Sequence, residues 1–298
     1  MSLFSLLGAL EIGLIFSLVA LGVLISFRIL NFPDLTVDGS FPLGAAVAAT
    51  AIAAGIDPFM ATLAAILAGA VAGFMTGWLN VRLKIMELLA SILMMIALYS
   101  INLRIMGGPN IPLINDATVF SVLQPASMHD YMFRPILLFV VIVAAKLLLD
   151  WFLSSEMGLA LRATGANARM ARAQGVATGR ATLMGLALSN ALVALAGALF
   201  AQSQGGADVS MRIGTIVIGL AAVIIGESLL PARKLVWMTL AVILGAVLYR
   251  FFIVLALNTD FIGLKSQDLN LVTAVLVVIA LVLPAVKRKL FARKPGEV

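Results

Sequence analysis

Five polar residues within one ten-residue segment could contact a polar solute: Asn31, Asp34, Thr36, Asp38 and Ser40. The surrounding residues are largely apolar, and two prolines flank the acids, so the segment is too polar for an ordinary span and too apolar for a free loop. A helix broken at membrane depth exposes backbone groups that only protein or a water-filled cavity can satisfy. We therefore interpret segment 31–40 as part of a substrate pathway. The alternative is a cytoplasmic loop with its acids in water.

Acidic residues in the same region allow a second chemistry, the binding of a proton or sodium ion. Asp34 and Asp38 are four positions apart and would share one face if the segment were helical. Glu11 lies within a long apolar run, where a carboxylate is costly unless it faces protein or an interface. An ion-gradient-driven secondary transporter is therefore an alternative function.

Segment 154–182 is the longest polar stretch that reads as helical, and we name it the coupling segment. It carries four arginines against one acid, Glu156. Within it, residues 167–174 predict a short helix that Thr164 or Asn167 could cap and that Gly175 could end in a left-handed conformation. We interpret this helix as a docking element for a motor protein outside the membrane. The alternative is a solvated loop that carries only topogenic charge.

Motifs for nucleotide binding and hydrolysis are missing from the sequence. There is no G-x-x-x-x-G-K-[ST], no G-x-S-x-G and no H-E-x-x-H. With no cysteine and a single histidine, His129, thiolate or histidine-rich metal ligation is not expected. We therefore expect no catalytic residue and no directly bound cofactor or metal. If ATP and Mg²⁺ drive the protein, another chain must hold them.

The composition is that of a polytopic membrane protein. The chain has 298 residues, of which 62% are hydrophobic and 11% charged, with mean hydropathy +1.13. Soluble domains have about 45–50% apolar and about 25% charged residues. The net charge of +6 does not indicate nucleic-acid binding, because the cations sit in short loops between apolar runs. The apolar N-terminus reads as part of the first span, with no removed signal.

Apolar runs divide the whole chain, residues 1–298, into one all-α transmembrane domain. The expected spans are 3–29, 43–54, 59–79, 87–103, 135–153, 183–201, 213–230, 235–257 and 269–286. The total is about eight to ten helices, because residues 30–55 could form one broken span or a re-entrant piece and a span. The positive-inside rule places the coupling segment in the cytoplasm and the N-terminus outside.

Three further features concern helix packing and pairing. Gly69, Gly73 and Gly77 repeat every four residues and predict a close helix contact. Segments 43–73 and 218–248 resemble each other and predict an inverted repeat. We also expect interfacial ion pairs, of Glu87 with Arg82 or Lys84 and of Glu227 with Arg233 or Lys234.

Two sequence patterns together resemble permeases of ATP-binding-cassette importers in the branched-chain amino acid and ribose superfamily. The first is Arg28-x-x-Asn31-Phe32 … Gly39 … Leu43-Gly44-Ala45. The second runs from Gly158-x-Ala160-x-Arg162-Ala163-x-Gly165-x-Asn167 through Ala171 and Gly175-Val176 to Ala196–Ala201. String 32–48 resembles a subgroup labelled tryptophan/tyrosine or uncharacterised, although its acidic pair Asp34 and Asp38 departs from many members.

The resemblance implies a dimer in the bacterial inner membrane, most simply of two copies, with two ATPase subunits beneath. It also implies a periplasmic or lipid-anchored solute-binding protein and a small solute, such as an aromatic or other amino acid. Residues 165–176 would be the coupling helix seated in a cleft of the ATPase. The residues that we expect to couple are Gly165, Asn167, Met170, Ala171, Gln174 and Gly175.

Overall fold

The computed structural model describes residues 3–114, 116–125, 129–212, 214–230 and 234–257, together with residues 274, 275, 278 and 282. Nearly all of the regular structure is helical, as predicted. The helices are α1 (Leu3–Val23), α2 (Val37–Ala53), α3 (Pro58–Val81), α4 (Glu87–Met106), α5 (Val119–Leu123), α6 (Asp130–Ser154), α7 (Glu156–Ala166), α8 (Ala168–Ala173), α9 (Thr178–Gln204), α10 (Thr215–Leu229) and α11 (Leu235–Leu257).

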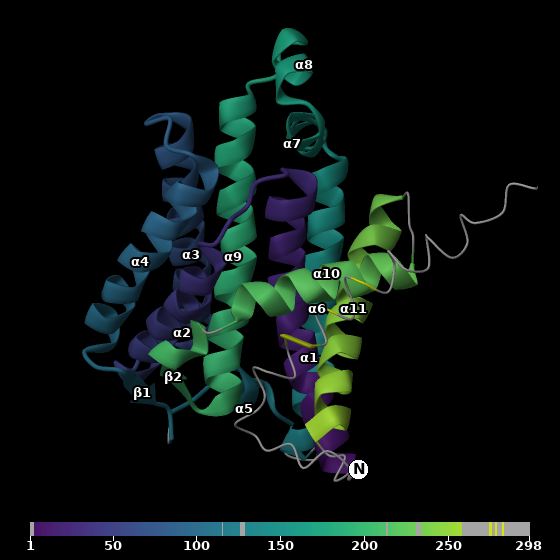
Figure 1. Cartoon of the computed structure of the whole chain (residues 1–298). Helices are drawn as coiled ribbons and strands as arrows, with labels where there is room; N and C mark the ends of the chain where they lie inside the picture. Colours follow the sequence, from purple (N-terminus) through teal and green to yellow (C-terminus); the bar gives the residue numbers. More distant parts are fainter. Residues whose placement is uncertain are drawn as a thin grey trace, which may run out of the picture.

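Three shorter kinds of element complete the described part. The π-helical turn η1 (Leu24–Ile29) continues α1, and the 3₁₀ turn η2 (Val209–Arg212) precedes α10. Strands β1 (Asn110–Pro112) and β2 (Gly206–Asp208) pair antiparallel, with Ile111 opposite Ala207. This small ribbon lies at the end of the molecule opposite α8 (Figure 1).

Seven helical stretches in the described ranges are long and apolar enough to cross a membrane. The shorter apolar helix α2 corresponds to the predicted span 43–54 and brings the number of predicted spans found to eight. The ninth, 269–286, lies outside the described residues, apart from four isolated positions. In Figure 1 the ends of α1, α3, α6 and the start of α9 lie toward α8, whereas the N-terminus lies at the far end. We call these two levels the α8 end and the N-terminal end.

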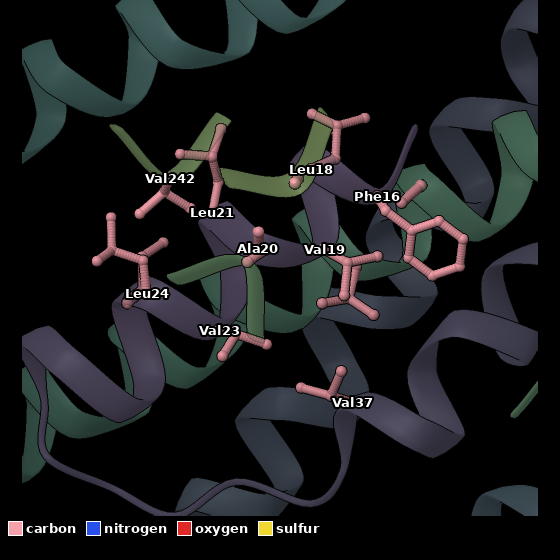
Figure 2. Close-up of a cluster of buried hydrophobic side chains, with 14 of the residues drawn as sticks. Phe16, Leu18, Val19, Ala20, Leu21, Val23, Leu24, Val37 and Val242 are labelled. Atoms are coloured by element: carbon pink, nitrogen blue, oxygen red, sulfur yellow. The ribbon is translucent and has the colours of Figure 1, made fainter. Parts of the chain in front are cut away.

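Helix α1 is the centre of the core. Its side chains Leu18, Val19 and Leu21 have no exposed surface, and the neighbouring helices α6, α9, α10 and α11 pack around it. Figure 2 shows this cluster, in which Val37 of α2 and Val242 of α11 lie near the α1 side chains. A helix that is apolar on every side is typical of a span enclosed by other helices.

The predicted glycine face of α3 is confirmed by its contact with α9. A Cβ atom on Gly69 would lie 2.3 Å from Cβ of Ala194, and one on Gly73 would lie 2.1 Å from the Leu186 carbonyl oxygen. Any side chain at these positions would push the two helices apart. Small residues thus allow the backbone approach that holds membrane helices together in the absence of a hydrophobic driving force.

Both predicted repeat segments form pairs of packed helices, α2–α3 and α10–α11. The first pair follows α1 but packs on α9, whereas the second pair follows α9 and packs on α1. Glycines mediate the second contact too, since a Cβ on Gly219 would lie 2.7 Å from the Val23 side chain. Each helix pair thus packs on the long helix that precedes the other pair, as expected for two related units. The inverted orientation of the two units stays a prediction.

Candidate functional site: the broken helix and the coupling segment

Segment 31–40 contains a break between two helices, as the sequence predicted for a broken span. Asn31 has a left-handed φ of 54°, residues 31–34 are not helical, and α2 begins only at Val37. The amide of Phe32 donates to the Ser26 carbonyl at 2.8 Å, so the end of η1 satisfies part of the break. Figure 1 shows this connection descending from the upper end of α1 to α2.

A buried hydrogen-bond network fixes the start of α2 against α9. The Asp34 carboxylate accepts from the Thr36 amide at 3.0 Å and from the Asn190 side-chain amide at 2.7 Å. Ser40 donates to the Asn190 side-chain oxygen at 2.7 Å, and the Thr36 hydroxyl lies 2.8 Å from that of Thr76. Asn190 of α9 therefore bridges both ends of the segment, and because these groups are buried, each needs its partner.

Asp38 has a different role from Asp34, and the two do not share a helix face, because the helix begins only at Val37. Asp34 precedes α2 in a non-helical stretch, whereas Asp38 lies in the first turn of α2. The Asp38 carboxylate accepts from the Ile216 amide at 2.7 Å, in the first turn of α10. The N-cap residue of α10 is Gly214, which has no side chain to cap the helix. Asp38 therefore caps α10 from another helix.

The five predicted pathway residues differ in accessibility. Asp34, Thr36 and Ser40 have no exposed surface and Asp38 is half-buried. Asn31 is exposed and lines a cavity of about 460 Å³ together with Arg28, Arg162 and Gly165. A solute could reach the buried network only after the helices around it separate, so the pathway role of these residues stays a prediction.

The coupling segment forms two short helices, α7 and α8, beyond the spans at the α8 end (Figure 1). The predicted helix over 167–174 is confirmed as α8. Asn167 is its N-cap, with its side chain accepting from the Met170 amide at 3.0 Å. Thr164, the alternative cap, instead lies within α7 and donates to the Ala160 carbonyl.

Helix α8 ends at Gly175 in the predicted left-handed conformation, with φ 85°. The Val176 amide donates to the Ala171 carbonyl at 3.0 Å and the Gly175 amide to the Arg172 carbonyl at 3.1 Å. This pair of bonds is the Schellman motif, which satisfies the last carbonyls of a helix. Both ends of α8 are thus fixed by local hydrogen bonds, so its exposed face has a defined shape.

The predicted coupling residues divide into exposed and structural ones. Met170 is 63% exposed, and Asn167, Gln174 and Gly175 are also exposed. Ala171 is 5% exposed and faces its own subunit. Gly165 is half-buried, and a Cβ there would lie 1.8 Å from the Ile29 carbonyl oxygen of η1. Gly165 thus allows α7 to contact the end of η1, next to the helix break that begins at Asn31.

Of the two predicted interfacial ion pairs, one has a different partner and the other is not formed with the predicted cations. Glu227 of α10 pairs with Arg28 of η1 at 2.6 Å, while Arg233 lies outside the described residues. Arg28 is far away in sequence but becomes a neighbour when α10 packs on α1. Within the described ranges, no salt bridge joins Glu87 to Arg82 or Lys84.

An intramembrane charge cluster escaped the sequence analysis. Lys146 and Asp150 of α6 form a salt bridge, and the Thr239 hydroxyl of α11 donates to Asp150 at 2.8 Å. Lys146 and Asp150 are only 9% and 7% exposed. Their spacing of four residues inside an apolar run was the available signal, because charges within a span are costly unless they are paired.

Comparison with known proteins identifies the family. Residues 5–283 match the family model described as "Branched-chain amino acid transport system / permease component". The chain belongs to this permease family. The match covers both the broken helix and the coupling segment.

Two similar proteins and one solved structure support the assignment. The permease is 41% identical over 267 residues to the "Tyrosine transport system permease protein" of Clostridioides difficile, covering 89% of this chain and 86% of that one. It is 38% identical over 224 residues to an uncharacterized protein of Rickettsia prowazekii, covering 75% and 77%. The structure of PsaBC from Streptococcus pneumoniae in complex with Fab shares the fold, with TM-score 0.54, 16% identity and coverage of 94% and 91%.

Family membership confirms several predictions about the permease. It is a multi-pass protein of the bacterial inner membrane and the translocation subunit of an ATP-binding-cassette importer. It is not an enzyme, because ATP hydrolysis belongs to a separate ATPase subunit. This decides against the ion-gradient alternative. Glu11, one candidate for that ion site, accepts a hydrogen bond from Ser203 at 2.6 Å.

Proposed function

We propose that the permease imports tyrosine or a closely related aromatic amino acid, handed over by a solute-binding protein. The observation that carries this proposal is the 41% identity to a permease named for tyrosine transport, over nearly the whole of both chains. A homodimer is the simplest assembly, because a second copy supplies the other half of a central pathway without another gene product.

Helix α8 is the element that would meet the ATPase. It stands beyond the spans, it is capped at both ends, and it presents the apolar side chain of Met170 to its surroundings. A helix that is capped at both ends presents its exposed side chains in a fixed arrangement, as a docking element requires. Met170 and Gln174 are therefore the direct contacts, while Gly165 and Ala171 hold α7 and α8 on the subunit. This docking requires that the α8 end lies in the cytoplasm.

Contacts within the subunit supply a route from α8 to the helix break. Helix α7 rests on η1 at Gly165, and η1 is tied to α10 by the Arg28–Glu227 pair. The start of α10 is held in turn by Asp38 of α2. A displacement of α8 would therefore reach both α2 and α10 through this series of contacts. ATP can drive alternating access only if the ATPase contacts differ between the two states.

The test is uptake by proteoliposomes that contain the permease, its ATPase and its binding protein. ATP-dependent accumulation of labelled tyrosine is expected, with competition by phenylalanine or tryptophan and none by a basic amino acid. Accumulation of a non-aromatic solute instead would reject the substrate assignment. Uptake driven by an imposed proton or sodium gradient, without the ATPase, would reject the ATP-driven mechanism.

Asn167 offers a specific test of coupling. The Asn167→Ala variant loses the cap of α8, which costs about 1 kcal/mol of helix stability. We expect more ATP hydrolysed per solute imported, with the subunits still assembled. The matched control is Asn167→Asp, which keeps a side-chain acceptor and should retain near-normal coupling. Equal coupling in both variants and the parent would show that the geometry of α8 is irrelevant.

A further inference from the structure

The turn between α3 and α4 lies beside α8 and has the features of a second contact surface. Within it Leu83 is 53% and Met86 74% exposed, and Arg82 and Lys84 are exposed cations. The turn is held in one shape, because the Asn80 side chain donates to the Ile85 carbonyl at 2.9 Å. Lys84 adopts a left-handed φ of 58°, which a lysine rarely does without such support.

A cavity of about 790 Å³ separates this turn from α7 and α8. One wall is formed by Lys84, Met86 and Glu87, and the other by Thr164, Ala168 and Arg172 of α7 and α8. Ala168 and Arg172 share one face of α8, whereas Met170, two positions from each, lies on the opposite face. A protein that contacts α8 on both faces would therefore also lie against the mouth of this cavity.

We propose that the ATPase docks on both α8 and the 82–86 turn and inserts a protruding element into the cavity between them. The inference rests on the proposed function of α8. The element should combine an apolar side chain, to cover Met86, with an acidic one, to pair with Lys84 or Arg172. Contacts on both sides of the cavity would fix the orientation of the ATPase relative to the permease. A contact with α8 alone would leave the ATPase free to rotate about that helix.

Charge argues against the permease's own C-terminal tail as the occupant. The tail KRKLFARKPGEV carries five cations and one acid, whereas the cavity walls present Lys84 and Arg172 against Glu87. Like charges would oppose its entry. Arg82, Arg172 and Arg180 line a neighbouring cavity of about 390 Å³ and favour an acidic partner surface.

Because the permease has no cysteine, single-cysteine variants report on single positions. Met86→Cys, Met170→Cys and Met132→Cys would each be labelled with a benzophenone maleimide in the assembled transporter and photolysed. We expect ATPase adducts from positions 86 and 170. No adduct is expected from Met132, which is 49% exposed near the N-terminal end.

The outcomes separate this inference from the proposed function. An adduct at position 170 without one at 86, or lipid adducts alone at 86, would overturn the second contact and leave the docking of α8 intact. No ATPase adduct at either position would reject both. An adduct with the permease's own tail at 86 would also overturn the inference.

A charge variant gives a second readout that does not depend on cross-linking. Lys84→Gln should weaken the binding of the ATPase about fivefold at low salt, the upper range for one exposed ion pair. The loss should disappear at high ionic strength, where such pairs are screened. An affinity and a salt dependence equal to those of the parent would contradict the charge pairing at Lys84.

Discussion

The buried pair Lys146–Asp150 should stabilise the permease in a way that depends on both charges being present. The two residues are only 9% and 7% exposed, and Lys146 lies eight residues before the end of α6, or about 12 Å from it at 1.5 Å per residue. Lys146 cannot reach that interface without leaving Asp150. Asp150→Ala would therefore leave a buried, unpaired cation, and removing one member of such a pair costs about 3–5 kcal/mol.

The double variant Lys146→Met/Asp150→Leu should behave differently from the single one. Replacing both members of a buried pair by apolar residues is often neutral or stabilising by about 1–4 kcal/mol. The Thr239 hydroxyl loses Asp150 but keeps the Val236 carbonyl of its own helix, at 3.1 Å. We therefore expect most of the stability lost in Asp150→Ala to be recovered.

Helix α6 supplies its own control. Asp130 and Arg134 have the same spacing of four residues, but their side chains are 63% and 33% exposed and 3.7 Å apart. Asp130→Ala should cost at most about 1 kcal/mol, as for exposed pairs. The assay is equilibrium unfolding of the purified permease in mixed micelles, followed by circular dichroism. Equal losses for Asp150→Ala and Asp130→Ala, or no recovery in the double variant, would refute the reasoning.

Substitutions at Asp38 and Gly165 test the route from α8 to the break, with Asp38→Asn and Gly175→Ala as their controls. Asp38→Ala should lower stability by about 1–2 kcal/mol through loss of the α10 cap, and should reduce uptake. Asp38→Asn keeps a side-chain acceptor for the Ile216 amide and should retain most uptake. If Asp38→Asn loses uptake although its stability is unchanged, the carboxylate acts by titrating and not as a cap. Gly165→Ala should separate α7 from η1 and abolish uptake while ATPase binding persists. A Cβ atom at Gly175 would have no atom within 4 Å. Gly175→Ala should therefore lower stability by only about 1 kcal/mol, because of the left-handed φ at this position. Normal uptake by Gly165→Ala would exclude that contact from the route.

The helical elements and the family could be predicted because their signals are local. Apolar runs of span length identify membrane helices, and the described spans agree with eight of the predicted ones. Helix α8 was predicted with Thr164 or Asn167 as its cap and with Gly175 as its end, because capping bonds join residues a few positions apart. The glycine face of α3 was visible because it repeats with the helical period.

Partner choice was decided only by the tertiary structure. Asp34 and Asp38 look alike in sequence, yet Asp34 binds Asn190 and Asp38 binds the amide of Ile216. Glu227 pairs with Arg28 across almost two hundred residues. A carboxylate binds whichever donor the packing brings near, and that depends on which helices meet. The sequence alone therefore determined that these groups must be paired within a membrane protein, while the packing of α2, α9 and α10 selected their partners.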